Sequence, residues 1–129
     1  MVPGKSEPGR QALIYRFTLP FALPTGNVIK KMHWAAYGRH RNRISSYVLG
    51  SLGRGSVQSP VIVQVRCYRL RVPDTDNAAF GCKPLYDSLV RLGWAVDDKP
   101  AWMRMVPPET VIVRKRSEQR TEITLQVGS

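Results

Sequence analysis

The sequence predicts an α+β fold: one small domain with a mixed sheet flanked by helices, in the order β-α-β-α-β-β. Short segments of alternating apolar and polar residues, rich in β-branched and aromatic side chains, are typical of strands. They alternate with longer segments whose apolar residues recur at helical spacing. A chain of 129 residues with 43% hydrophobic content is long enough for one buried core. We therefore expect one domain over residues 13–129, preceded by a disordered arm over residues 1–12, which holds charges, Gly and Pro but no long apolar run.

Four segments are predicted to be strands, at residues 14–19, 61–72, 110–115 and 121–127. In the second segment one face carries only apolar side chains, those of Val61, Val63, Val65 and Cys67. The last two segments are close in sequence, and we expect them to form a β-hairpin.

Two regions are predicted to be helical. Residues 27–49 indicate a helix or a helix pair broken near Gly38, followed by a Gly/Ser-rich loop over residues 50–60. Residues 77–92 indicate a second helix with Asp76 or Asn77 as its N-cap and Gly93 at its end. Pro84 either begins the main body of this helix or kinks it. The buried stripe of this helix is expected to be Leu85, Leu89 and Leu92.

Positive charge is concentrated in the first half of the chain. Residues 1–73 contain twelve Lys and Arg against one acid, Glu7, whereas the remainder is balanced. A pI near 10.4 with charge distributed in this way favours nucleic acid as the partner. No strongly amphipathic basic helix is evident, which argues against a membrane partner. The residues expected to contact phosphates are Lys30, Lys31, Arg39, Arg41 and Arg43.

Aromatic and histidine side chains are interleaved with these cations. We expect Trp34 and Tyr37 in the core, with stacking on an exposed base as the alternative. His33 and His40 are expected at a surface or facing DNA, since nothing gives them the spacing of metal ligands.

The two cysteines, Cys67 and Cys82, have neither a disulfide framework nor a metal-binding spacing. We expect both to be buried, reduced residues of a cytoplasmic protein. The chain shows no apolar run long enough to span a membrane and no signal peptide at its start.

Five of the nine acidic residues fall between positions 74 and 98, namely Asp74, Asp76, Asp87, Asp97 and Asp98. Taken singly, the DxDN motif and the Asp97-Asp98 pair are typical of turns and helix caps, and Lys83 of a solvated helix face. Their order is more informative: a DxDN motif follows a strand, a helix with Lys83 comes next, and an acidic pair follows its glycine. Clustered carboxylates suit Mg²⁺. The strand end and the turn after the helix are therefore expected to meet at one edge of the sheet and to form a metal site facing a phosphate backbone.

The segments DTDN, KPLYDSL and LGWAVDD resemble the signature of the RusA family of crossover (Holliday) junction endodeoxyribonucleases. The early segment FTLPFALPTGN is similar to the N-terminal pattern of that family, without its double proline, and the resemblance covers about residues 14–127. Lys83 stands farther from the aspartates than the corresponding lysine of the best-known member.

The resemblance implies a Mg²⁺-dependent enzyme, with Mn²⁺ as a substitute and no small-molecule cofactor, that acts as a homodimer on four-way DNA junctions. It implies that Asp74, Asp76 and Asp98 bind the metal, that Lys83 is also required, and that Asp97 is an auxiliary ligand. Asp87 is expected to face a structural partner instead. Two alternatives stay open: a phage nuclease of broader specificity for branched DNA, and a non-catalytic basic module that binds nucleic acid.

Overall fold

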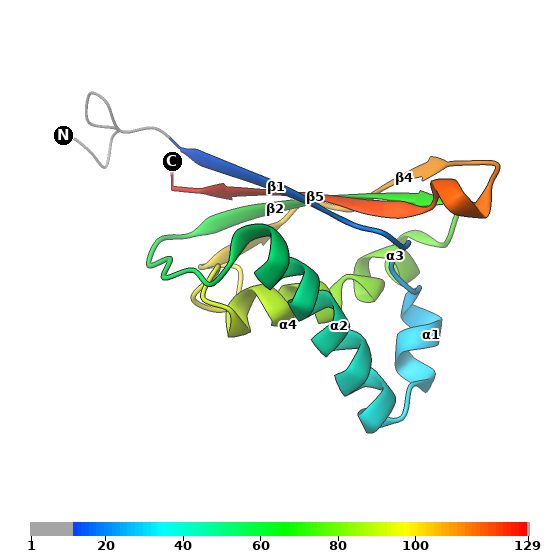
Figure 1. The fold of residues 1–129 in the computed structure, drawn as a ribbon, viewed down its shortest axis with the longest axis horizontal. Helices are drawn as coiled ribbons and strands as arrows, with labels where there is room; N and C mark the ends of the chain where they lie inside the picture. The colour runs from blue at the N-terminus through cyan, green and yellow to red at the C-terminus, as the bar shows by residue number, and fades with distance from the viewer. Residues whose placement is uncertain (1–11, 129) are drawn as a thin grey trace.

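A computed structural model describes residues 12–128, apart from the side chains of Thr75 and Asp76. The predicted N-terminal arm lies outside the described residues, except for its last position. The elements follow one another as β1 (Leu13–Leu19), α1 (Gly26–Lys31), α2 (Trp34–Leu52), β2 (Val61–Arg69), α3 (Thr75–Gly81), α4 (Lys83–Arg91), β3 (Met103–Met105), β4 (Glu109–Ile112), a short 3-10 helix (Arg116–Glu118) and β5 (Arg120–Val127). The α+β class with a mixed sheet is confirmed. All four helices lie on one side of the sheet (Figure 1).

The sheet has the order β1-β5-β2-β3, and β4 also pairs with β2. Strand β5 is antiparallel to both β1 and β2, whereas β3 and β4 run parallel to β2. The predicted hairpin over residues 110–127 is therefore wrong, because β2 lies between β4 and β5. Strand β5 lies between β1 and β2, and its side chains Ile123 and Leu125 are buried in the core. Strand β4 has no buried residue, which agrees with its place outside β2. The short strand β3 was not predicted.

The core lies between the sheet and the helices. On β2 the predicted apolar face is confirmed, with Val61, Val63, Val65 and Cys67 all buried. The stripe predicted on the second helix is also confirmed: Leu85 and Leu89 are fully buried and Leu92 nearly so. From α2, the core receives Ile44 and Val48.

The first helical region is a helix pair whose break lies at Met32 and His33, both extended, and not at Gly38. Gly38 lies inside α2, where a glycine is costly but tolerated. His33 caps α2, because its Nδ1 accepts a hydrogen bond from the backbone N–H of Ala35 at 3.2 Å. Figure 1 shows α1 and the N-terminal part of α2 extending away from the sheet, with their connection at the far end.

The second helical region is divided into α3 and α4 at Cys82. Pro84 stands in the first turn of α4, as one of the two predicted alternatives had it. The N-cap of α3 is Asp74 and neither of the predicted alternatives, Asp76 and Asn77, and its side chain makes no capping hydrogen bond. Gly93 ends α4 as predicted, with φ of 85°, and a Cβ there would lie 2.1 Å from the carbonyl oxygen of Gly55.

Candidate functional site

The four predicted metal ligands lie at three places around α3 and α4. Asp74 is exposed and precedes α3, Asp76 lies in the first turn of α3, and Asp97 and Asp98 follow α4. The sheet does not bring these places to one edge in the expected way. Met103 pairs with Val61 at the start of β2, so the turn before β3 lies toward that end, whereas Asp74 follows the other end of β2.

The helices bring part of the predicted site together instead. A pocket of about 390 Å³ is lined by Asp98, Lys83, Ala79, Phe80, Tyr86 and Met105. The carboxylate after α4 thus shares a pocket with the lysine at the start of α4 and with the last turn of α3. Two of the four residues that the resemblance marks as catalytic, Asp98 and Lys83, lie in this pocket, which we call the α3–α4 pocket.

Lys83 is held by a short network across the helices. Its Nζ lies 3.6 Å from Oδ1 of Asp87, one turn along α4. The other oxygen of Asp87, Oδ2, accepts a hydrogen bond of 2.7 Å from the hydroxyl of Tyr37 on α2. Burial raises the pKa of Tyr37, and the bond to Asp87 raises it further, so the phenol stays a donor. Asp87 therefore faces structural partners, as predicted.

Asp97 supports the turn that carries Asp98. Its Oδ1 accepts a hydrogen bond of 2.7 Å from the backbone N–H of Asp98. This bond lowers the pKa of Asp97, and so do a hydrogen bond to the side chain of Asp98 and the positive charge of Lys99. Asp97 is therefore ionised at neutral pH, and one of its oxygens is engaged in the turn.

The donor chemistry of the acidic stretch fits a hard divalent cation, because Asp74, Asp97 and Asp98 offer carboxylate oxygens. Among the described side chains no three His, Cys, Asp or Glu residues form a group that could hold a metal ion. One predicted ligand, Asp76, falls outside that description, so the proposed ligand set stays a prediction.

The predicted phosphate-binding residues fall into two groups. Lys30, Lys31 and Arg39 are exposed on the α1–α2 pair. Arg41 is only half-exposed, and the guanidinium of Arg43 lies over the ring of Phe21 at 4.1 Å. The latter two therefore also contribute to packing.

The α1–α2 pair contacts the α3–α4 pocket directly. The ammonium of Lys30 lies 5.2 Å from the ring centre of Phe80, which lines that pocket. Close backbone packing permits this contact, because a Cβ on Gly26 would lie 2.9 Å from Cβ of Phe80. A cationic surface thus adjoins the pocket that holds Asp98.

The aromatic residues of this region correct the sequence interpretation. Trp34 is 80% exposed, so its expected place in the core is wrong, and Tyr37 is half-buried against Asp87. His40 is also half-buried, and its Nε2 is buried without a hydrogen-bond partner in the described part of the chain. Trp34 follows directly after the break at Met32–His33, and the wrong position of that break hid its exposure.

Cys67 and Cys82 are buried and free, as expected. Burial raises the pKa of the Cys82 thiol to about 12, so this cysteine is unreactive at neutral pH. No helix in residues 12–128 has the length and apolar character needed to cross a membrane.

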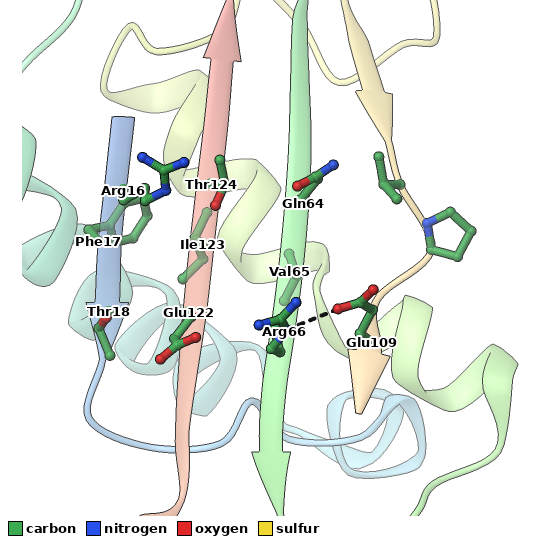
Figure 2. A pocket seen from close by; sticks show the side chains of 12 residues that line it. Arg16, Phe17, Thr18, Gln64, Val65, Arg66, Glu109, Glu122, Ile123 and Thr124 are labelled. Atoms are coloured by element: carbon green, nitrogen blue, oxygen red, sulfur yellow. Dashed lines mark hydrogen bonds and ion pairs between the residues drawn. The ribbon is translucent and has the colours of Figure 1, made fainter. Parts of the chain in front are cut away.

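The face of the sheet away from the helices forms a second concave surface. Its pocket of about 500 Å³ is lined by side chains of β1, β2, β4 and β5. Figure 2 shows Arg16, Thr124 and Gln64 in one row across β1, β5 and β2, with Glu122 in the next row. Its carboxylates are already engaged: Glu109 pairs with Arg66 at 2.9 Å, and Glu122 accepts a hydrogen bond from Tyr68 at 2.8 Å. This face is therefore a poorer candidate for a metal site than the α3–α4 pocket.

Comparison with known proteins identifies no relative: no protein-family model matches the chain, and no curated protein matches it significantly.

Proposed function

We propose that this protein is a Mg²⁺-dependent endonuclease of the RusA family that cuts four-way DNA junctions. The observation that carries the proposal is the α3–α4 pocket, where Asp98 and Lys83 lie together beside Phe80 and the cation Lys30. A carboxylate can bind the metal ion, a lysine can offset charge on the phosphate, and an adjoining basic surface can bind the DNA backbone.

In this proposal Asp74, Asp76 and Asp98 hold the cation, and Asp97 keeps the turn of Asp98 in place. Bound Mg²⁺ supplies Lewis-acid chemistry, which lowers the pKa of a water nucleophile and offsets charge on the scissile phosphate. Lys83 stabilises the additional negative charge that develops on the phosphate during attack. The hydrogen bond from Tyr37 holds Asp87, and Asp87 in turn pairs with the ammonium of Lys83.

The exposed cations of the α1–α2 pair bind the DNA backbone without reading sequence. Resolving a junction takes two cuts on opposed strands, so we propose that the active form is a homodimer with two equivalent sites. Sedimentation of the protein alone and with a junction tests this assembly, and a monomer in both samples contradicts it.

The decisive experiment compares a labelled four-way junction, a flap and a linear duplex, each with Mg²⁺ or EDTA. We expect Mg²⁺-dependent cutting of the junction, and Asp76→Asn should bind it but not cut it. Glu109→Gln serves as the matched control, because it removes an exposed carboxylate on the opposite face of the sheet.

Each alternative has its own outcome in this assay. Equal rates on the flap and the junction favour a nuclease of broader specificity for branched DNA. Binding that falls with salt but ignores Mg²⁺, with no cutting of any substrate, favours the non-catalytic module. Cutting by Asp76→Asn at the wild-type rate shows that the site is assigned wrongly.

A further inference from the structure

Trp34 is the largest of the exposed apolar side chains in the described part of the chain. It is the first residue of α2, and 80% of its surface is accessible to solvent. Tryptophan normally buries most of its large apolar surface. The core does not need Trp34 at this position, which suggests that a ligand contacts it.

The surroundings of Trp34 are cationic. Residues 26–52 carry five Lys and Arg and no Asp or Glu. The exposed residues Lys30 and Lys31 are the last two residues of α1, shortly before Trp34. The ring centres of His33 and Trp34 are 5.4 Å apart. A hollow beside it is lined by Tyr37, Arg39 and Arg41, among others.

The position of this residue keeps it clear of the rest of the protein. The connection between α1 and α2 lies at the end of the pair that is farthest from the sheet (Figure 1), and Trp34 follows that connection. The side chain of His33 accepts a hydrogen bond from the backbone N–H of Ala35 and so caps α2. Trp34 therefore lies in a capped first turn of the helix.

We propose that Trp34 stacks on a DNA base at the branch point and thereby distinguishes branched DNA from linear duplex; the branched substrate rests on the proposed function. Positive charge without any acid selects a polyanion, and the indole offers a flat surface to a base. The bases of a linear duplex are stacked on each other on both sides. At a branch point that stacking is interrupted, and a base can be covered by an aromatic side chain.

The test measures binding in EDTA, so that cutting plays no part. Trp34→Ala should weaken binding of a four-way junction about tenfold, which lies within the range for loss of one aromatic–base stack. Binding of a linear duplex of the same sequence should stay within about twofold, because phosphate contacts supply that affinity. Trp34→Phe should retain part of the junction affinity.

A second readout follows the indole itself. Junction binding should quench tryptophan fluorescence in the wild type but not in Trp34→Phe, which keeps the buried Trp94 and the half-buried Trp102. Leu49→Ala is the matched control, because it removes an exposed apolar side chain from the other end of α2. It should bind both DNAs as the wild type does.

Three results would overturn the inference: wild-type junction affinity in Trp34→Ala, an equal loss on junction and duplex, or quenching by anionic lipid vesicles and not by DNA. Failure of the proposed function looks different. If no DNA is cut with Mg²⁺ while Trp34 still selects junctions, the nuclease is wrong and the stacking stands. If junctions are cut and Trp34→Ala binds them normally, the stacking alone is wrong.

Discussion

The α1–α2 pair and the segment of α3 and α4 have opposite charge although they touch each other. Residues 26–52 hold five cations and no acid, whereas residues 74–98 hold five aspartates. The two regions meet where Lys30 lies over Phe80 and where Tyr37 donates to Asp87. In the proposed function this difference separates a surface that binds DNA from a pocket that cuts it. Substitutions in one region should therefore change affinity, and those in the other should change rate.

The largest expected effect separates the two regions directly. Asp98→Asn should reduce the cleavage rate of bound junction by more than about 100-fold, because even groups that only support metal ligands are worth 10- to 100-fold. Affinity for the junction in EDTA should stay the same, since the basic helix pair is intact. Single-turnover cleavage and fluorescence anisotropy measure the two quantities. A variant that loses affinity and rate together would show that the regions do not act separately.

The second prediction breaks the contact between the regions. A Cβ on Gly81 would lie 2.1 Å from the carbonyl oxygen of Pro24, just before α1. Gly81→Ala should lower the free energy of unfolding by about 1–3 kcal/mol, as overpacking does, because α1 must move away from α3. Thermal and urea unfolding measure this change.

Gly38→Ala is the control for that substitution. Gly38 lies inside α2, and a Cβ added there would meet no neighbouring atom within 4 Å, so the alanine should stabilise the protein by roughly 0.5–1 kcal/mol. Equal stability of the two variants would contradict the close approach of α1 and α3.

The third prediction concerns the binding region alone. Replacing both Lys30 and Lys31 by Ala should reduce the slope of log affinity against log salt by about two, because each phosphate contact contributes about one unit. The cleavage rate of fully bound junction should change little. Anisotropy titrations between low and moderate salt give the slope. An unchanged slope would show that these exposed lysines do not contact phosphates.

Local pattern was sufficient for much of the fold. Strands β1 and β2, the buried stripe of α4 and its end at Gly93 were all predicted from periodicity and from glycine chemistry within a few residues. The predicted hairpin was wrong because local pattern does not determine which strands pair. Two strands close in sequence were assumed to pair, whereas β5 pairs with β1 and β2, and that choice depends on long-range packing.

The candidate site, too, was predicted only in part from the sequence. The residue types and their order were visible in the sequence, and so was the structural role of Asp87. The contact between Lys30 and Phe80 and the pocket shared by Asp98 and Lys83 depend on how the helices pack, which no local pattern carries. Trp34 was misjudged because a tryptophan normally buries most of its surface, and because the break before it was placed at Gly38.

The smallest predicted effect comes from His40, where α2 packs on the protein body. Burial lowers its pKa below 6.5, and the charge of Arg43 lowers it further. The unfolded chain therefore binds more protons below about pH 6.5, and the stability that neutral His40 contributes above this pH is lost as the pH falls toward and through its folded-state pKa. We expect the melting temperature to fall slightly between pH 7.5 and 5.5, and by less in His40→Gln. His33→Asn keeps a capping side chain and replaces an exposed histidine, so it should follow the wild type. If His40→Gln follows the wild-type pH profile instead, protonation of His40 is not coupled to folding.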